Sequence, residues 1–444
     1  MKIWFKTILT LIMSIGLLAC NSDGSNQLQL GVDRQDIYGP LLAGKNVGLM
    51  VNQSSLDSKG THTIDKLVAL ESKYNFKVTT LFAVEHGIRG DKEAGEGDND
   101  HIDDKTGLPI ISLYGSDNGR PRARPTEDQL SNVDIVIYDL QDVGVRFFTY
   151  TISMHRMMES IQAYGKAFMV FDRPNPNGDY VYGPLLEEEN VSGIGIHPIP
   201  MVHGLTSGEL ATMIVGQGWL TGVDEYRWSL FGAEQYRLPV EKLHVITMKN
   251  YTHQQPYSLP INPSPNLATD LAIRLYPALG LFEATSVNMG RGSSFPHEQL
   301  GFPDPSFYIN TQYHIDPSIT AYGWPQGGKT VYGERFNYAN PQHYRASIKE
   351  FVRWWLAFQH NAKSLAVAYD QEANYLDYQE SHFVIRPAWL AKLIGTKSFL
   401  ADLQSYSKEV TELESLVKKL ELRWQKDLED YRYLRNKYRL YSEY

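Results

Sequence analysis

Residues 133–146 read Val-Asp-Ile-Val-Ile-Tyr-Asp-Leu-Gln-Asp-Val-Gly-Val-Arg, a short apolar run that ends in two carboxylates, a glycine and an arginine. A run rich in valine and isoleucine predicts a buried strand over Val133–Tyr138. Asp139 and Asp142 follow directly, so ionisable groups stand at the carboxyl end of that strand. This stretch therefore predicts a buried sheet and a polar edge on it.

The same pattern recurs through the first half of the chain. Further buried strands are predicted at Val47–Val51, Val78–Val84, Ile110–Tyr114, Ala167–Phe171 and Ile199–Val202. Between them, amphipathic stretches predict helices near Thr63–Tyr74, Tyr150–Tyr164 and Ser207–Gly216. Strands that alternate with helices indicate a parallel sheet covered by helices, which is an α/β fold.

The second half of the chain differs in composition, because Pro, Asn and Tyr become frequent from about residue 225. Helices are predicted over 346–360 and Val410–Tyr431, and a strand over Lys329–Tyr332. We expect a first domain over 31–235 and a second, smaller α+β domain over 236–444. The 444 residues are enough for two domains of this size.

The N-terminus has the features of a lipoprotein signal. Lys2 and Lys6 precede an apolar stretch over 8–18, and Leu17-Leu18-Ala19-Cys20 reads as a lipobox around the chain's one cysteine. We expect a signal peptide over 1–19, lipidation of Cys20 and a polar tether over 20–30. The expected location is a membrane anchor, with the protein facing the periplasm or the cell exterior. The net charge of −9 and the lack of a Lys/Arg cluster argue against a nucleic-acid partner.

Polar side chains follow nearly every predicted strand. They are Asn52, Glu85 with His86, Tyr114, Asp139 with Gln141 and Asp142, Asp172 with Arg173, and His203. Ligands of open parallel sheets bind at the carboxyl ends of the strands. Turn chemistry alone asks mainly for Gly, Asn, Asp and Pro, so this collection favours an active site.

The segment Glu85-His86-Gly87-Ile88-Arg89-Gly90 places a carboxylate, an imidazole and a guanidinium in one glycine-flanked loop. A partly buried Glu85 would have a raised pKa and could act as a general acid. The alternative is a salt bridge between Glu85 and Arg89, with His86 as a packing group. The spacing fits both.

A second carboxylate could come from Asp139 or Asp142. On an extended chain both cannot point the same way, so we expect one at the site and the other in a turn or cap. Paired with Glu85, it would give the two-acid arrangement of glycoside hydrolysis. Thr206 and Glu209 fit a capping box, so Glu209 is expected to cap a helix.

Several signatures are absent from the sequence. There is no dinucleotide-binding glycine motif, no P-loop, no zincin motif and no Gly-x-Ser-x-Gly elbow. No ligand spacing supports a metal site built from His86, Asp139 and His203. We therefore expect neither a metal nor another cofactor.

The sequence resembles the exo-β-N-acetylmuramidase (NamZ-like) glycosidases along essentially the whole chain that follows the signal peptide. In the first half the resemblance lies in residues 85–90, 106–109, 112–115, 139–146, 149–150, 172–176, 203–206 and 208–210. In the second half it lies in Ser264-Pro265-Asn266, Glu283, Gly290-Arg291-Gly292 and residues 437–441. The chain departs from the family pattern at Ser286, at Asn288-Met289 and at Pro296-His297-Glu298.

The resemblance implies a Rossmann-like N-terminal domain, a smaller C-terminal α/β domain and an active site between them. It also implies release of N-acetylmuramic acid from the non-reducing end of peptidoglycan fragments, with Glu85 as the candidate catalytic glutamate. We predict His86, Asp142 and Asp139 as its catalytic neighbours. The predicted substrate-binding residues are Asn52, Arg89, Gln141, Arg146, Tyr150, Asp172, His203, Asn266, Glu283, Asn288 and Arg291.

N-acetylmuramic acid carries a lactyl carboxylate, which Arg291, Arg89 or Arg146 could hold through a bidentate contact. Our hypothesis assigns it to Arg291; the alternative is a turn with a surface arginine. The sequence leaves open a covalent, an inverting and a substrate-assisted reaction. It also leaves open two other functions, a metal-assisted peptidoglycan amidase or deacetylase and a non-catalytic peptidoglycan-binding lipoprotein.

Overall fold

The computed structural model describes residues 27–85, 87–88, 100–117, 120–221, 223, 235–236, 238–319, 326–366 and 382–444. The predicted signal peptide, Cys20 and most of the predicted tether lie outside these residues, as do His86 and Arg89. In the described part of the chain, no helix is long and apolar enough to cross a membrane.

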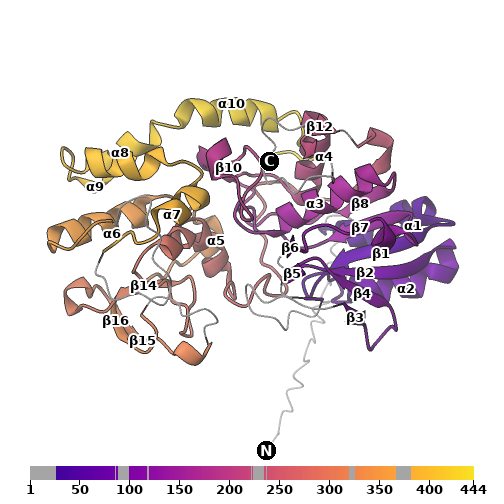
Figure 1. Cartoon of the computed structure of the whole chain (residues 1–444), viewed down its shortest axis with the longest axis horizontal. Coiled ribbons are helices and arrows are strands. Elements are labelled where there is room, and N and C mark those ends of the chain that lie inside the picture. Colours follow the sequence, from indigo (N-terminus) through magenta and orange to yellow (C-terminus); the bar gives the residue numbers. More distant parts are fainter. Residues whose placement is uncertain are drawn as a thin grey trace, which may run out of the picture.

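A seven-stranded sheet with the order β13-β8-β7-β1-β2-β4-β3 forms the centre of the N-terminal part. Its strands are β1 (Asn46–Val51), β2 (Lys77–Ala83), β3 (His101–Ile102), β4 (Pro109–Ser112), β7 (Ile135–Asp139), β8 (Ala167–Phe171) and β13 (Leu243–Ile246). Neighbouring strands are parallel except for β3, which runs antiparallel to β4 at the edge. The predicted α/β class is confirmed (Figure 1).

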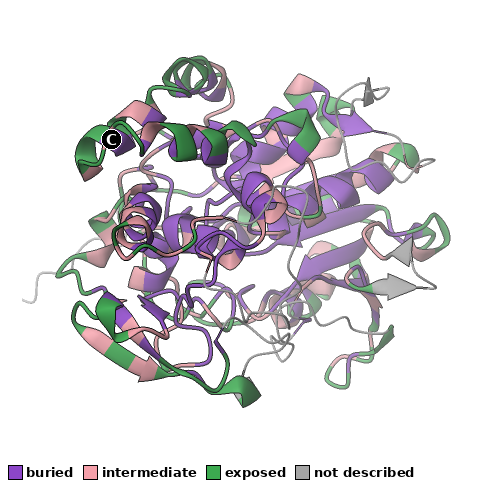
Figure 2. Ribbon diagram, turned by 60° about the vertical axis from the view of Figure 1, so that its left-hand side comes forward, coloured by how far each residue is buried: buried purple, intermediate pink, exposed green. Residues whose placement is uncertain are grey.

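Helices cover both faces of this sheet because its side chains alternate between two cores. Leu49 and Ile137 pack into one core with residues of α1 (Gln35–Leu42) and α2 (Thr63–Tyr74). Met50 and Val136 point the other way, into a core shared with α3 (Tyr150–Ala163) and α4 (Ser207–Gln217). The central strands β1 and β7 are thus buried on both sides, and Figure 2 shows buried residues in purple.

The start of α4 confirms the predicted capping box. The Thr206 side chain accepts a hydrogen bond from the Glu209 N–H, and the Glu209 side chain accepts one from the Thr206 N–H. This places Glu209 in a structural role at the N-terminus of the helix.

The predicted strand at Ile199–Val202 does not join the central sheet. Residues Pro200–Val202 form β10, which pairs antiparallel with β9 (Tyr182–Leu185). The strand that pairs parallel with β8 on the side away from β7 is β13, which lies further along the chain. A short apolar run is compatible with either position, and Pro200 lacks the N–H that a central strand would donate.

The C-terminal part contains a small antiparallel sheet of order β14-β16-β15, formed by Gln299–Phe302, Thr330–Arg335 and Thr311–His314. Its helices are α5 (Asp270–Leu279), α6 (Lys349–His360), α7 (Pro387–Ile394), α8 (Ser398–Tyr406), α9 (Leu413–Glu421) and α10 (Gln425–Arg435). Strand β15 alternates half-buried and exposed residues, so this sheet has one solvent face (Figure 2).

Two further ribbons and several 3-10 helices complete the described elements. The ribbons are β5 (Ser116–Asp117) with β6 (Arg120–Pro121), and β11 (Leu220–Thr221) with β12 (Gln235–Tyr236). The 3-10 helices are η1 (Gly31–Asp33), η2 (Asp128–Leu130), η3 (Glu188–Asn190), η4 (Val240–Lys242), η5 (Gly280–Ala284), η6 (Pro305–Phe307), η7 (Pro317–Ile319) and η8 (Pro341–His343).

The single helix predicted over Val410–Tyr431 is wrong, because α9 and α10 are separate. The N–H of Arg423 and that of Trp424 each bond a carbonyl only three residues back, which tightens the chain between the two helices. Trp424 is buried there, so packing of its indole accompanies the break. The apolar spacing continues across the junction and hides it from the sequence pattern.

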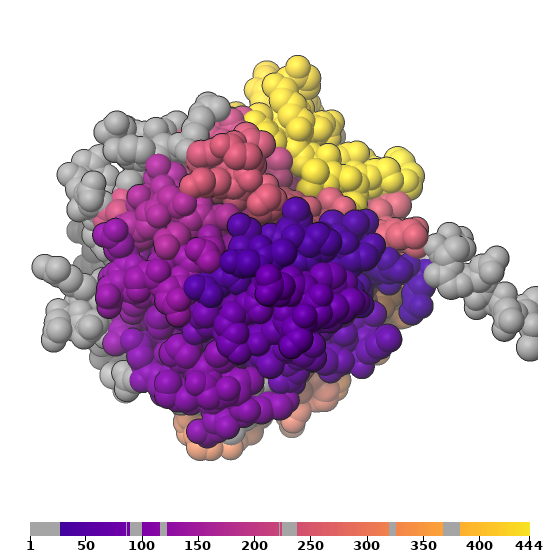
Figure 3. Space-filling model, turned by 90° about the vertical axis from the view of Figure 1, so that its right-hand side faces the viewer, coloured from indigo at the N-terminus to yellow at the C-terminus, as the bar shows by residue number. Residues whose placement is uncertain are grey.

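The chain crosses between its two halves more than once. β13 belongs to the central sheet although it follows the boundary predicted at 235/236. The last residues return to the N-terminal part, where Tyr441 Oη donates to Asp172 at 2.6 Å and Leu440 N donates to Glu209 at 2.8 Å. Figure 3 shows this C-terminal segment in yellow beside the N-terminal unit. The tail therefore ties the two halves together.

Candidate active site

The carboxyl ends of the parallel strands bring the predicted polar residues to one edge of the sheet. Asn52 follows β1, Glu85 lies two residues after β2, Asp139 ends β7 and Asp172 follows β8. This arrangement is the one expected for a ligand site on an open α/β sheet.

Glu85 is half-buried and held by two hydroxyl groups. Tyr114 Oη donates to Glu85 Oε1 at 3.1 Å, and Thr149 Oγ1 donates to Glu85 Oε2 at 2.6 Å. Tyr114 follows β4, whereas Thr149 stands just before α3. Hydrogen bonds to both oxygens fix the plane of the carboxyl group and its direction.

Asn52 and Tyr150 form one wall beside Glu85. Asn52 Nδ2 donates to Tyr150 Oη at 2.7 Å, and Tyr150 Oη donates to the carbonyl of Pro263 at 3.1 Å. Burial raises the pKa of Tyr150 well above its usual value, with the Glu85 carboxylate adding to the effect, so the phenol stays protonated. These contacts join the end of β1 to the segment that leads into α5.

Asp139 has a structural position, which corrects its prediction as a catalytic residue. Arg173 Nε and Nη2 donate to its two oxygens at 2.6 and 2.9 Å, and Thr63 Oγ1 donates as well. All three side chains are buried. Because both oxygens are occupied by the guanidinium, Asp139 links β7, α2 and the turn after β8.

Asp142 differs from Asp139 in having one oxygen without a partner. Gly144 N donates to Asp142 Oδ2 at 2.6 Å, whereas Oδ1 is buried and has no hydrogen-bond partner among the described residues. His203 Nε2 lies 3.8 Å from Asp142 Oδ2. Burial raises the pKa of Asp142 to about 7. Of the two aspartates, the geometry favours Asp142 as the second carboxylate.

Two other predicted binding residues, Asp172 and Gln141, make contacts that hold the fold. Asp172 accepts hydrogen bonds from Tyr441, Thr206 and the N–H of Gly208. Gln141 Nε2 donates to the carbonyls of Asp142 and Pro174, at 2.8 and 2.7 Å. Neither Asp172 nor the Gln141 amide nitrogen is available to a sugar. Both residues follow a strand, which suggested a role in ligand binding. In the structure their side chains instead hold together the segments that connect the strands.

Arg146 is the clearest correction among the binding residues. Its buried guanidinium donates to the carbonyls of Pro184, Ile199 and Leu393, at 3.1, 2.9 and 2.8 Å. Burial lowers its pKa to about 9. Arg146 thus connects β9 and the chain before β10 to α7, and it does not present a charge to a substrate carboxylate.

The C-terminal half contributes a pair of charged residues, Glu283 and Arg291. Arg291 Nη2 lies 3.5 Å from Glu283 Oε1, and Trp389 Nε1 donates to Glu283 Oε2 at 3.4 Å. Burial raises the pKa of Glu283, while Arg291 opposes the rise and the Glu85 carboxylate adds to it. Glu283 therefore lies within electrostatic reach of Glu85, the residue predicted to be catalytic, and Arg291 lies beside Glu283.

Asn288 builds the turn that presents Arg291. Its Oδ1 accepts from Gly290 N at 2.7 Å, and its Nδ2 donates to the carbonyl of Arg291 at 3.1 Å. Gly290 and Gly292 have positive φ angles of 86° and 80°, which favour glycine on both sides of the arginine. Asn288 is fully buried and has a positioning role, while the nearby Asn266 contributes its carbonyl to His297.

Sequence reasoning missed residues that line this site. Tyr276 lies on α5 within electrostatic reach of Glu283, Arg291, Glu85 and Asp142. Its ring packs edge-on against His297, with centroids 5.2 Å apart. Thr149 and Trp389 were missed too. Tyr114 stood among the strand-end residues and could have been found there, whereas Tyr276 looks like any apolar position of an amphipathic helix.

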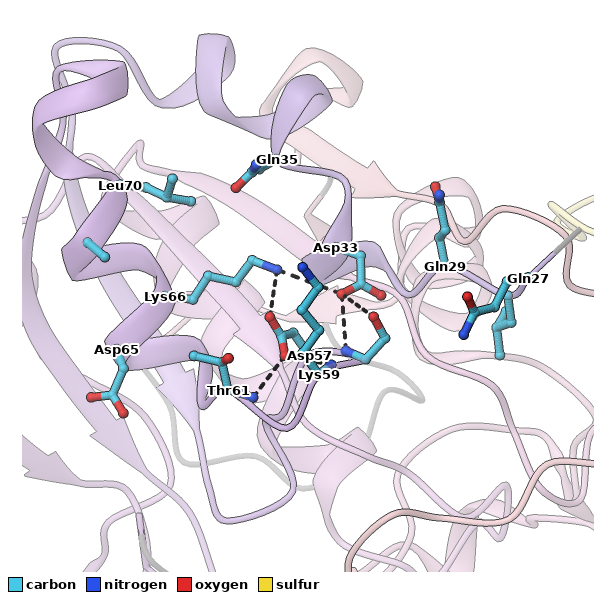
Figure 4. Close-up of a pocket in the computed structure, with 13 residues that line it drawn as sticks. Gln27, Gln29, Asp33, Gln35, Asp57, Lys59, Thr61, Asp65, Lys66 and Leu70 are labelled. Carbon is cyan, nitrogen blue, oxygen red and sulfur yellow. Dashed lines mark hydrogen bonds and ion pairs between the residues drawn. The ribbon is translucent and has the colours of Figure 1, made fainter. Parts of the chain in front are cut away.

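No group of three or more His, Cys, Asp or Glu side chains that could hold a metal is found within the described ranges. A cavity of about 530 Å³ lies between α2, η1, the loop after β1 and residues 27–29. Figure 4 shows that Lys66 there points between Asp57 and Asp33, at 2.9 and 3.7 Å. The charged groups Lys66, Asp57 and Asp33 of this cavity already pair with one another, and no predicted site residue lines the cavity.

The chain is similar to known proteins over most of its length. The model described as exo-beta-N-acetylmuramidase NamZ, N-terminal, matches residues 47–271, and the C-terminal model of the same name matches 274–441. The peptidoglycan beta-N-acetylmuramidase NamZ of Bacillus subtilis (strain 168) is 37% identical over 311 residues, which cover 67% of this chain and 69% of that protein.

Two crystal structures of DUF1343 family proteins from Bacteroides fragilis NCTC 9343 share the fold. One is 30% identical with a TM-score of 0.71, and the other is 24% identical with a TM-score of 0.70. Each match covers 94% of this chain and 100% of the solved chain.

The raised pKa of Asp142 predicts a pH-dependent stability. The folded chain keeps a proton on Asp142 up to about pH 7, whereas an unfolded aspartate loses it near pH 3.8. The Asp142 contribution to stability is therefore full below pH 3.8 and is lost as the pH rises through 7. Asp142→Asn keeps the acceptor for Gly144 and removes this loss. We expect it to melt about 2 °C or more above wild type at pH 8, and the difference to shrink at pH 5.

The matched control is Asp304→Asn. Lys363 and the Ser306 N–H hold the pKa of Asp304 at about 2, so this group stays ionised from pH 5 to pH 8. Its effect on the melting temperature should be the same at both values. A pH-independent difference for Asp142→Asn would show that Asp142 titrates normally.

Proposed function

The chain belongs to the exo-β-N-acetylmuramidase NamZ family, and we propose that it hydrolyses the bond of a non-reducing terminal N-acetylmuramic acid in peptidoglycan fragments. The observation that carries this proposal is the Glu85 carboxyl group, held by Tyr114 and Thr149 at the carboxyl edge of the sheet. A carboxyl group fixed in this way can give its proton to the glycosidic oxygen as the bond breaks.

Asp142 is the second carboxylate in this proposal. Its Oδ1 has no partner among the described residues, so it can accept a proton from water or a hydrogen bond from the 2-acetamido N–H. Tyr276 lies within electrostatic reach of both Asp142 and Glu85, so both acids act on the same tyrosine. The stereochemistry of the released sugar distinguishes the two uses of Asp142.

Arg291 recognises the lactyl carboxylate of the substrate. Asn288 and the two flanking glycines fix its turn, and Glu283 lies 3.5 Å from its guanidinium. A carboxylate that binds Arg291 gains a charge-assisted, bidentate contact that N-acetylglucosamine cannot make.

The protein is anchored to a membrane through a lipid on Cys20 and faces the periplasm or the cell exterior. The support is the lipobox at Leu17-Leu18-Ala19-Cys20, together with the attachment of the following segment to the body of the protein. Gln29 pairs with Lys249 through two backbone hydrogen bonds of 3.0 Å. Few residues thus separate Cys20 from the folded part of the chain.

The first experiment compares wild type with Glu85→Gln on para-nitrophenyl N-acetylmuramide, using the N-acetylglucosaminide as a second substrate and repeating each assay with a chelator. Glutamine keeps an oxygen acceptor for one of the two hydroxyls and can donate its amide N–H to the other, but it has no acidic proton. We expect muramide-selective, chelator-insensitive turnover, and a kcat lower by about 10²–10⁴-fold in the variant. The exposed Glu414→Gln serves as the control and should match wild type.

Turnover that is indifferent to Glu85 would remove Glu85 from the mechanism. Loss of turnover with the chelator would instead support the metal-assisted amidase or deacetylase. Binding of muramyl saccharides with no turnover of any muramide would support the binding protein.

Arg291→Ala tests the lactyl contact through inhibition by free sugars. We expect inhibition by N-acetylmuramic acid to weaken by about 10–100-fold, because one charge-assisted contact is lost, and inhibition by N-acetylglucosamine to stay unchanged. Arg345→Ala, at an exposed arginine paired with Asp179, is the control. Equal weakening of both sugars would mean that Arg291 does not read the lactyl group.

Cys20→Ala tests the anchor. The variant should leave the membrane fraction of producing cells, because the modified thiol is gone. Ser25→Ala, in the same polar segment, should stay with the membranes. A membrane-bound Cys20→Ala protein would refute lipidation at this position.

A further inference from the structure

The turn that carries His203 is held by a helix from the far end of the chain. On α10, Tyr431 Oη donates to the carbonyl of His203 at 2.8 Å, and Arg435 Nε donates to the carbonyl of Gly204 at 3.0 Å. Gly204 has a φ of +66°, and a Cβ there would lie 2.9 Å from the carbonyl oxygen of Tyr180. This turn is therefore tightly packed, and α10 holds it through two hydrogen bonds.

The same turn is paired with the segment that carries Asp142. Val145 and Val202 form an antiparallel bridge, and Asn175 Nδ2 donates to the carbonyl of Leu205 at 2.8 Å. A Cβ at Gly144 would lie 2.1 Å from Asn175 Oδ1, so the chain around Gly144 packs directly on Asn175. Asn175 thus fixes the Asp142 turn and the His203 turn relative to one another.

The His203 ring is a neutral donor that faces Asp142. Leu205 N donates to His203 Nδ1 at 3.2 Å, which assigns the proton of the neutral ring to Nε2. Burial lowers the pKa of His203 to about 3, with Arg435 and Arg146 adding to the effect, so the ring stays neutral. Nε2 is buried, has no hydrogen-bond partner among the described residues, and lies 3.8 Å from Asp142 Oδ2.

We propose that His203 is a positioning residue for Asp142, and that α10 holds it in place through Tyr431 and Arg435. The proposal deepens the proposed function and rests on it, because Asp142 is the second carboxylate there. A movement of about 1 Å brings Nε2–H within hydrogen-bond distance of the carboxylate. The contact stabilises the ionised form of Asp142 and directs its Oδ1 away from His203.

Few other ionisable groups lie near Asp142 and His203. The ionisable groups that face Asp142 among the described residues are His203, Tyr138, Tyr150 and Tyr276, and burial raises the pKa of each tyrosine well above its usual value. Arg435, Arg146 and His197 face His203, and burial keeps His197 neutral by lowering its pKa. Removing the Nε2–H donor therefore acts mainly on Asp142.

The test measures the pH profile of kcat/KM on the muramide for wild type, His203→Leu and His203→Gln. Leucine has no donor, whereas the glutamine amide places an N–H near the position of Nε2. Loss of a donor to a carboxylate raises its pKa. We expect the acidic limb of the profile to move up by about one pH unit in His203→Leu, and to return toward wild type in His203→Gln.

A second readout does not depend on activity. Wild type and Asp142→Asn differ in stability only where Asp142 is ionised in one of the two states, so the pH at which this difference develops reports the Asp142 pKa. The same comparison is made between His203→Leu and the double variant with Asp142→Asn. We expect the midpoint of the difference to lie at a higher pH there. If wild type turns over no muramide, the proposed function fails, and this melting experiment still decides the role of His203. An unchanged midpoint would overturn the proposal.

Tyr431→Phe tests the contribution of α10. It removes the hydroxyl that holds the His203 carbonyl. We therefore expect the acidic limb of the kcat/KM profile to move to higher pH, by less than in His203→Leu. The shift should vanish when the change is made in the His203→Leu background, because the helix acts through that ring. Tyr433→Phe, at an exposed position of the same helix, is the control. Equal, additive shifts in both backgrounds would show that α10 acts on Asp142 by another route.

Discussion

The buried ion pair between Asp139 and Arg173 sets the geometry of the carboxyl edge of the sheet. It joins the end of β7 to the turn after β8, and Thr63 at the start of α2 donates to the same carboxylate. Removing either partner of such a pair leaves a buried charge that costs about 3–5 kcal/mol. Because Asp139 is committed to Arg173, the chain leaves β7 in a fixed direction, and Asp142 turns toward the His203 side of the edge.

The buried acids of this protein differ in how fully they are bonded. Asp139 and Asp172 have donors on both oxygens, and the tail residue Tyr441 supplies one of those for Asp172. Asp142 has one oxygen without a partner in the described part of the chain. Buried polar groups are ordinarily satisfied, so an exception points to a site that a ligand or water completes. This contrast distinguishes Asp142 from its structural neighbours better than its position in the sequence does.

Local patterns predicted most of the N-terminal sheet, because a strand buried on both faces needs a nearly unbroken apolar run. Thr63–Tyr74 was predicted as a helix and forms α2 over the same residues. The failures arose where distant segments decide the outcome. Pro200–Val202 pairs with β9, and Trp424 packs into the core between α9 and α10. At the site, Arg146 looked like a ligand-binding residue, yet three carbonyls from distant segments surround it.

The site joins two halves of the chain that contribute different chemistry. Glu85 and its two hydroxyls come from the parallel sheet and the start of α3, whereas Glu283, Arg291 and Trp389 come from the C-terminal half. Tyr276 lies within electrostatic reach of charged groups from both. The proposed acid is therefore on a rigid sheet edge, and the group proposed to read the lactyl carboxylate is on a glycine turn. Since Tyr441 and α10 tie the end of the chain back to the sheet, the separation of these two groups depends on contacts far from either.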